Sequence, residues 1–237
     1  PTNVSLFGES AGGCSVLALF VAPAAKSLFV RGWAMSPSIG QLRTTDRADQ
    51  SVQLLLDDLG AASLDDLAQK SSQEIVAAQS RLLRDPKDVV TMFSPTIGGD
   101  VVPNNFHDHI ASDQRELVIG TLRDESRLWV ALNPAAATLT TETARESFAT
   151  RFGTAADRAW DTYTQLRPAS TPAQMLAALQ SDESFRAPAW KVIEARDRSG
   201  SPTWSYFFTW PTPVFDGILG ACHGLDIPFV FDNLSAP

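Results

Sequence analysis

The sequence predicts an α/β fold built on a mostly parallel sheet. Short apolar runs, each about as long as a buried strand, occupy residues 4–7, 32–35, 117–120 and 203–208. Segments with the helical spacing of apolar residues lie between these runs, as the crossover connections of a parallel sheet require. A third observation is a Gly-x-Ser-x-Gly pattern at residues 8–12, which joins the first apolar run directly to a helix-competent segment.

The Gly-x-Ser-x-Gly segment is centred on Ser10. This pattern is typical of a nucleophile elbow, a strained turn between a strand and a helix that lifts one side chain clear of the backbone. We expect Gly8 and Gly12 both to be required, because a Cβ at either position would collide with the neighbouring strand and helix. The following helix places the positive end of its dipole beneath Ser10, which makes Ser10 the candidate nucleophile.

A serine hydroxyl needs a base to take its proton and an acid to hold that base. In the fold that uses this elbow, the acid and then the histidine follow the serine in the chain. His107 and His109 precede any acid that follows a strand, whereas His223 lies between glycines after the 203–208 strand. The chain has 3 histidines, so His223 is the candidate base.

The acid should follow a strand that lies between the serine and the histidine. The 117–120 strand is such a strand, and Asp124 and Glu125 come shortly after it. Either carboxylate satisfies the order and the loop context, so the residues alone leave both open.

Four stretches resemble the type-B carboxylesterases, a family that includes cholinesterases, para-nitrobenzyl-type esterases and some lipases. The stretches are residues 1–13, 119–125, 185–189 and 222–231. The resemblance implies an α/β-hydrolase fold and a single, incomplete catalytic domain over residues 1–237. It also implies hydrolysis of small carboxylic esters through an acyl-enzyme, with no metal and no organic cofactor.

The resemblance also assigns individual residues. It selects Glu125 over Asp124 as the acid of a Ser-His-Glu triad, and it suggests that Ser36 is a serine that supports this acid. Pro37 departs from the usual glycine after that serine. Glu9, beside the nucleophile, either favours a charged imidazole or a cationic ligand, or forms an ion pair with an arginine that is absent from this sequence.

Family members carry several strands and a His-Gly-Gly-type loop before the elbow, and a closing helix after the histidine loop. We therefore expect this chain to be the middle to late portion of a larger enzyme, with the N-terminal strands missing. In that case the Ala11 backbone N–H is the remaining donor of the oxyanion hole.

Several helices can be placed from local signals. Helical spacing covers residues 46–59 and 72–83, and Ser71 with Glu74 forms a capping-box pattern. A further helical block covers about residues 138–180, with starts marked by Thr154 and Thr171, and the short alanine run 135–137 reads as a loop. We interpret the block as an insertion over the mouth of the site, with plain scaffold as the alternative.

Composition limits the partners. A net charge of −8 and a pI of about 4.8 argue against nucleic acid, which requires clustered cations. No apolar run approaches the roughly 18–20 residues of a membrane span, so we expect a soluble globular protein. The sequence leaves open a cytoplasmic or a secreted location, and it leaves the oligomeric state open.

The remaining candidate residues have ordinary interpretations. Cys14 and Cys222 are expected to be small buried residues near the site, with an oxidation-sensitive thiol as the alternative. His107 and His109 lack a third metal ligand nearby, so we expect a solvated loop that enters a helix. Trp129, shortly after the acid, is a core residue or a pocket wall.

Two classes of function remain. The first is a serine ester hydrolase, within which amidase, thioesterase and lipase activities are open because one intermediate serves all acyl transfers. The second is a non-catalytic binding or adhesion protein on the same scaffold. Such proteins usually lose a member of the triad, and all three positions are filled here.

Overall fold

A computed structural model describes residues 2–84 and 93–234. Its main sheet has four parallel strands in the order β1-β2-β5-β6. These strands are β1 (Ser5–Glu9), β2 (Arg31–Met35), β5 (Glu116–Leu122) and β6 (Thr203–Phe208). A second, two-stranded parallel sheet pairs β3 (Arg43–Thr44) with β4 (Thr96–Ile97). The predicted α/β class with a mostly parallel sheet is confirmed.

The four predicted strands all occur, and three of them have shifted ends. Strand β6 has the expected bounds, whereas β1 excludes Val4 and continues to Glu9. Strand β1 is longer than predicted because Glu9 still pairs with Met35 of β2. Pairing with the neighbouring strand therefore extends β1 beyond its last apolar residue. Strand ends are therefore set by pairing between strands as well as by local hydrophobicity.

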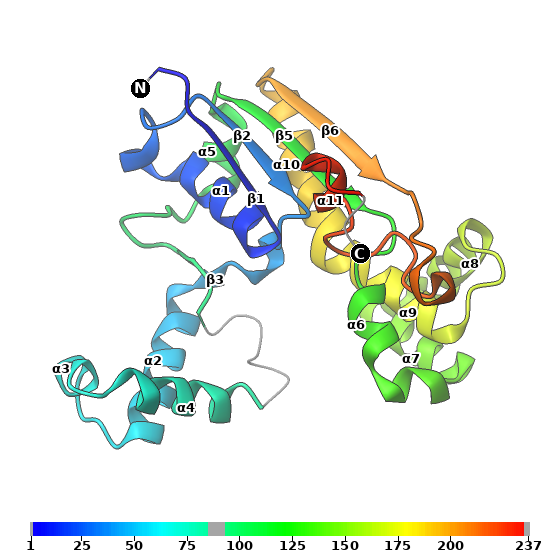
Figure 1. Ribbon diagram of the computed structural model, residues 1–237, viewed down its shortest axis with the longest axis horizontal. Helices are drawn as coiled ribbons and strands as arrows, with labels where there is room; N and C mark the ends of the chain where they lie inside the picture. Colours follow the sequence, from blue (N-terminus) through cyan, green and yellow to red (C-terminus); the bar gives the residue numbers. More distant parts are fainter. Residues whose placement is uncertain (1, 85–92, 235–237) are drawn as a thin grey trace.

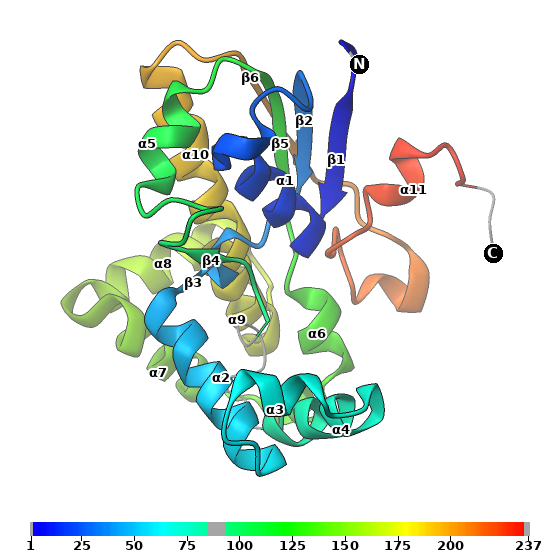
Figure 2. The same ribbon diagram turned by 90° about the vertical axis from the view of Figure 1, so that its left-hand side faces the viewer.

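Three helices cover one face of the main sheet: α1 (Ala11–Val21), α5 (Phe106–Ser112) and α10 (Ala187–Arg198) (Figures 1 and 2). The main hydrophobic core lies between these helices and the strands. Its fully buried members include Leu17, Ile110, Leu117, Ile119 and Val192. The short helix α11 (Ile227–Val230) lies on the opposite side of the sheet (Figure 2).

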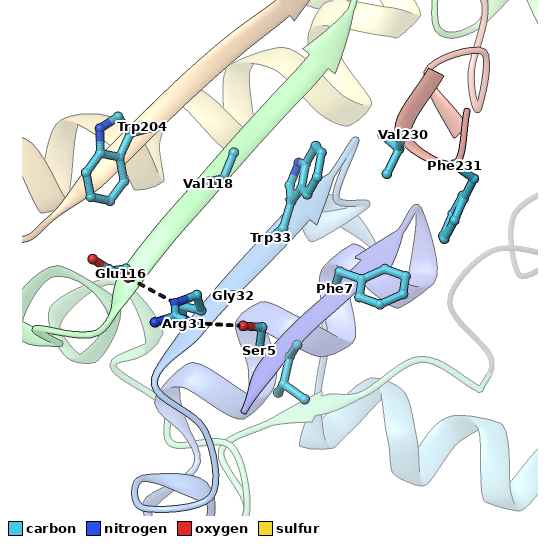
Figure 3. Close-up of a pocket in the computed structure, with 11 residues that line it drawn as sticks. Ser5, Phe7, Arg31, Gly32, Trp33, Glu116, Val118, Trp204, Val230 and Phe231 are labelled. Atoms are coloured by element: carbon cyan, nitrogen blue, oxygen red, sulfur yellow. Dashed lines mark hydrogen bonds and ion pairs between the residues drawn. The ribbon is translucent and has the colours of Figure 1, made fainter. Parts of the chain in front are cut away.

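The opposite face of the sheet carries apolar side chains around a cavity of about 360 Å³ (Figure 3). Phe7, Trp33, Val118 and Trp204 line it from the strands, and Phe231 lines it from the segment after α11. None of the residues that line this cavity is among the sequence-predicted site residues.

A separate helical unit follows β3, made of α2 (Thr45–Leu59), α3 (Leu64–Ala68) and α4 (Ser72–Leu82). The predicted capping box is confirmed: the Glu74 backbone N–H donates to the Ser71 hydroxyl, and the Glu74 carboxylate accepts from the Ser71 backbone N–H. The unit extends away from the main sheet (Figure 1).

The helical block after the acid loop contains α6 (Arg127–Leu132), α7 (Thr141–Phe152), α8 (Ala156–Leu166) and α9 (Pro172–Ser181). Helices α7, α8 and α9 share a small core of their own, which includes Phe148, Trp160 and Met175. Residues 135–137, expected as a loop, lie within a short 3-10 helix, η3 (Pro134–Thr138). The role of the block as an insertion over the site stays a prediction.

One helix start is confirmed and one is wrong. Thr171 caps α9, with Pro172 in the first turn and Gln174 completing a capping box. Thr154 does not cap α8, because residues 153–155 form a 3-10 turn that follows α7 directly. A cap requires an extended backbone, and this turn does not provide one.

Five other short helical segments connect these elements. A π-helical segment, η5 (Asp182–Arg186), joins α9 to α10, and the 3-10 segments are η1 (Pro23–Ala25), η2 (Ile39–Gln41), η4 (Gly153–Ala155) and η6 (Val214–Gly217). In the described ranges, 2–84 and 93–234, every helix is too short or too polar to cross a bilayer.

Candidate active site

Ser10 occupies the turn between β1 and α1 in a conformation that non-glycine residues rarely adopt. Its φ is 59° and its ψ is −117°. The turn is held because the Ser10 N–H donates to the Met35 carbonyl at 2.9 Å and the Ser10 carbonyl accepts from Cys14 N–H at 2.9 Å. Ala11 is the first residue of α1, so the helix N-terminus lies directly behind the serine, as predicted.

The glycines of this turn are not equivalent. A Cβ on Gly8 would lie 2.4 Å from the backbone carbon of Gly12, a distance that requires the backbone to move. A Cβ on Gly12 would meet nothing within 4 Å, so the expectation that both glycines are sterically required is wrong for Gly12. The difference lies in the direction of the Cα–Cβ bond: a Cβ on Gly8 would point at the Gly12 backbone, whereas a Cβ on Gly12 would point into open space. Gly13 is the second position without room for a side chain, because a Cβ there would lie 2.8 Å from the Met35 carbonyl oxygen.

Glu125 and His223 are in direct contact at the carboxyl ends of β5 and β6. Glu125 Oε2 lies 2.6 Å from His223 Nδ1. The His223 backbone N–H also donates to the Glu125 carbonyl at 3.2 Å, so the two loops are joined twice. The other carboxylate oxygen, Oε1, accepts from Ser36 Oγ and from Leu122 N–H, each at 2.7 Å. Glu125 is fully buried, and both of its carboxylate oxygens have hydrogen-bond partners.

Ser36 therefore contacts the acid that the resemblance selected. It is fully buried and has a φ of 41°, in the region that favours glycine. Its backbone N–H donates to the Gly120 carbonyl at 2.8 Å, which ties the end of β2 to β5. Pro37 after it does not prevent this geometry.

Glu9 contacts His223 from the other side of the ring. Glu9 Oε1 lies 3.0 Å from His223 Nε2. The contact is close but poorly aligned as a hydrogen bond, and Nε2 has no hydrogen-bond partner within the described part of the chain. The structure thus brings Glu9, Glu125 and His223 together, without a hydrogen bond from Nε2 to the Ser10 hydroxyl. Among the described residues the ionic partner of Glu9 is His223, and the alternative ion pair with an arginine absent from this sequence stays a prediction.

Two carboxylates beside one imidazole change its protonation. Burial of His223 lowers its pKa, but the contacts with Glu125 and Glu9 outweigh burial and raise the pKa to about 9. The resting site therefore favours a charged imidazole at neutral pH.

Asp124 has different partners from Glu125. Its carboxylate accepts from Ala221 N–H at 3.0 Å and pairs with Arg123 at 2.9 Å and Arg167 at 2.8 Å. Burial raises the pKa of Asp124, and these donors outweigh burial and leave the pKa below its usual value. The alternative in which Asp124 contacts the histidine is not what the structure shows.

Two aromatic side chains pack on the imidazole. The Trp129 ring lies 5.0 Å from the His223 ring, and the Phe185 ring lies 4.6 Å from it, centroid to centroid. Trp129 and Phe185 stack almost in parallel. Trp129 is half exposed, so of its two interpretations the structure fits a wall better than a core position.

Sequence reasoning missed the roles of Phe185 and Asp226. Phe185 comes from the π-helical segment η5, and local sequence does not predict that this segment returns to the histidine. Asp226 is buried three positions after His223 and accepts a hydrogen bond from Tyr206 OH at 2.6 Å. Burial raises the pKa of Asp226, and the negative charges of Glu125 and Glu9 raise it further. The sequence signal that could have drawn attention to Asp226 is its position in the same loop as His223.

The remaining candidates lie as follows. Cys14 and Cys222 are buried free thiols, and burial raises the pKa of both, that of Cys14 to about 11. This fits the expectation of small buried residues rather than reactive thiols. His107 and His109 lie inside α5 and are exposed, not in a loop before a helix. No cluster of three or more potential metal ligands occurs in residues 2–84 and 93–234.

A cavity of about 570 Å³ opens beside the serine turn. Ala11, Cys14 and Ser15 line it from α1, and Gln79 and Leu83 line it from the α4 region. The first turn of α1 therefore borders a space large enough for a small organic molecule.

A serine on a strained strand-to-helix turn, a carboxylate after a later strand and a histidine after the next one define the α/β-hydrolase class. The order in the chain and the parallel sheet both agree with this class. The chain belongs to the carboxylesterase family, whose model matches residues 1–237.

Individual relatives support this assignment. The chain is 31% identical over 242 residues to the para-nitrobenzyl esterase of Bacillus subtilis, covering 99% of this chain and 47% of that protein. It is 26% identical over 238 residues to the phenmedipham hydrolase of Pseudarthrobacter oxydans, covering 99% and 48%. The fold superposes on a Geobacillus stearothermophilus carboxylesterase with a TM-score of 0.81 at 26% identity, covering 100% of this chain and 49% of that one. The chain thus spans about half the length of the curated relatives it matches.

Proposed function

We propose that this protein hydrolyses small carboxylic esters through an acyl-enzyme intermediate. Ser10 attacks the ester carbonyl, and His223 accepts the serine proton and passes it to the departing alcohol. Glu125 holds the imidazole and stabilises its charged form. Water, activated by the same histidine, then releases the carboxylic acid. The reaction needs only protein groups in these roles.

The observation that carries this proposal is the contact of Glu125 with His223 Nδ1. It orients the imidazole so that Nε2 can act as the base once that nitrogen is deprotonated, as a serine hydrolase requires. The contact is specific, because the other carboxylate oxygen of Glu125 accepts two further hydrogen bonds that fix the position of the side chain. Glu125 is thus a rigidly held support for the imidazole.

The base must change partner to act. His223 Nε2 faces Glu9 in this structure, and Glu9 precedes Ser10 in the chain. For catalysis Nε2 must exchange the Glu9 carboxylate for the Ser10 hydroxyl, and such contacts commonly tighten only when substrate binds. In this mechanism Glu9 holds the imidazolium that forms when Ser10 loses its proton.

The developing oxyanion needs donors. The Ala11 backbone N–H opens α1, where no earlier turn of the helix supplies it with an acceptor. It is the donor that this chain contributes, and the helix dipole adds to it. The acyl group would lie in the adjoining cavity, between the start of α1 and the α4 region.

The names of the relatives support the substrate class. Proteins similar to this chain are described as a para-nitrobenzyl esterase and a phenmedipham hydrolase. We therefore infer an uncharged small-molecule ester, and we infer that α6 and the segment η5 border its binding site through Trp129 and Phe185.

The direct test is labelling with a fluorophosphonate, followed by mass spectrometry to locate the modified residue. A label on Ser10 that is lost in Ser10→Ala and greatly slowed in His223→Ala supports an activated serine. A folded protein that takes no label points instead to a binding or adhesion protein. A label on another serine would show that the elbow is not the reactive site.

A further inference from the structure

A second recess lies beside the acid loop, on the side occupied by Asp124. It has a volume of about 390 Å³ and is bordered by the end of β5, helix α8 and the π-helical segment. Four arginines line it: Arg123, Arg127, Arg167 and Arg186. Ser10, Glu125 and His223 do not line it.

The recess has more positive than negative charge. Its four guanidinium groups face two lining carboxylates, Asp124 and Asp182. Asp124 is shared by Arg123, Arg127 and Arg167, and Asp182 pairs with Arg186. Glu125 is close by, but its carboxylate is already committed to Ser36, Leu122 and His223. Every arginine thus contacts a carboxylate, but the lining still carries a formal surplus of two positive charges.

Burial makes this surplus costly. The side chains of Arg127 and Arg167 are 16% and 15% exposed. Burial lowers the pKa of Arg127, and the neighbouring Arg167 and Arg123 lower it further by repulsion. The pKa of Arg186 is lowered in the same way, by burial and by Arg167. The Nε atoms of Arg127 and Arg186 are both buried and have no hydrogen-bond partner among the described residues.

The outer wall of the recess is apolar. Leu166 is 76% exposed and Phe207 is 50% exposed, and both line the recess. The Arg186 guanidinium stacks on the Phe207 ring at 4.7 Å. A ligand that places an anionic group among the arginines would thus lay any hydrocarbon part against Leu166 and Phe207.

We propose that this recess binds an organic carboxylate, an anion that carries an apolar or aromatic group. The carboxylate would neutralise part of the arginine surplus through charge-assisted hydrogen bonds. Its apolar part would cover Leu166 and Phe207. A cluster of positive charge at this site contrasts with the net charge of −8 on the whole chain. The inference does not depend on the proposed ester hydrolysis.

The probe is 4-fluorobenzoate, titrated against the purified protein by ¹⁹F NMR, with the unfolding temperature measured in parallel. We expect saturable binding and a rise in the unfolding temperature. Arg123→Gln should weaken the affinity about tenfold, the typical worth of one charge-assisted hydrogen bond. Arg123 is the most suitable arginine to change, because Arg167 and Arg186 also hold backbone carbonyls of the acid loop.

Leu166→Glu supplies a carboxylate from the protein itself. It should raise the unfolding temperature without ligand and abolish the response to 4-fluorobenzoate, whereas Leu166→Gln should do neither. Arg145→Gln is the matched control for lost charge, because Arg145 is exposed and pairs with Asp157 away from the recess. It should leave the affinity unchanged.

Two results would overturn the proposal. Equal affinity in wild type, Arg123→Gln and Leu166→Glu would place the benzoate elsewhere on the protein. Protection by inorganic phosphate as strong as that by 4-fluorobenzoate would show a simple oxyanion site with no role for the apolar wall. Circular dichroism on each variant separates loss of binding from loss of fold.

Discussion

Asp124 and Glu125 are consecutive and both buried, yet their carboxylates have separate sets of partners. Glu125 contacts His223 Nδ1, whereas Asp124 is surrounded by guanidinium groups and by Ala221 N–H. Both acids therefore join the same two loops, Glu125 through His223 and Asp124 through Ala221. We therefore expect neutralisation of Glu125 to reduce mainly activity, and neutralisation of Asp124 to reduce mainly stability.

For Glu125→Gln we expect loss of activity with little loss of stability. Gln keeps the size of the side chain and can still accept from Leu122 N–H, but it no longer stabilises the charged imidazole. On the order of a 10³- to 10⁴-fold fall in kcat is expected from such a change. The measurement is the turnover of para-nitrophenyl acetate, with unfolding in urea as the check on folding. A variant with more than a tenth of the wild-type kcat would contradict the assigned role.

For Asp124→Asn we expect the reverse. Removing the charge leaves Arg123, Arg127 and Arg167 without their shared carboxylate, and breaking a buried pair costs about 3–5 kcal/mol. Urea unfolding measures this loss. A variant as stable as wild type would show that the arginines are already compensated by other groups.

The pH dependence follows from the protonation of His223. Its pKa of about 9 lies above the ordinary value of 6.5, and the proposed base must be neutral to accept a proton. We expect kcat/KM of the free enzyme to rise with pH and to level off above about 9. Because the folded pKa is raised, the stability that the charged imidazole provides is complete below pH 6.5 and is lost as the pH rises through about 9.

Glu9→Gln removes one of the two carboxylates that raise this pKa. The inflection of the pH–rate profile should move to lower pH, because the imidazolium loses a negative neighbour. An unchanged inflection would show that Glu9 does not contact His223 in solution. Glu116→Gln, an exposed change of equal charge at the start of β5, is the control.

Ser36→Ala tests the support of the acid. Its hydroxyl donates to Glu125 Oε1, so the variant should lower kcat about tenfold, the typical worth of a hydrogen bond to a charged group. Ser201→Ala is the control for loss of a buried serine hydroxyl, since Ser201 is also buried and its hydroxyl donates to the Ala111 carbonyl, away from Glu125. Equal effects of the two changes would argue against a specific role for Ser36.

The serine turn gives a purely steric prediction. Gly8→Ala forces a Cβ against the Gly12 backbone and should destabilise the fold by several kcal/mol, since neither segment can move freely. Gly12→Ala meets open space and should be tolerated. Thermal unfolding of the two variants decides between this asymmetry and the expectation that both glycines are equally required.

Much of the fold could be predicted from the chain alone. The four strands of the main sheet, the capping boxes at Ser71 and Thr171, and the turn at Ser10 depend on local patterns of residue type. Local patterns misplaced the start of α8, because the preceding helix ends in a 3-10 turn that leaves no extended residue for a cap. They also placed His107 and His109 outside the helix that contains them.

The sequence by itself determined which residue types stand at the ends of which strands, and hence the candidates Ser10, Glu125 and His223. These features are local, because a strand, a turn and a helix start are each specified within a few residues. Only the tertiary structure decided which acid faces the histidine, that Glu9 lies at Nε2, and that Phe185 and Trp129 pack on the ring. It also decided that four arginines gather beside Asp124. The physical reason is that these contacts join segments tens of residues apart, and burial and charge pairing in the folded core select their partners.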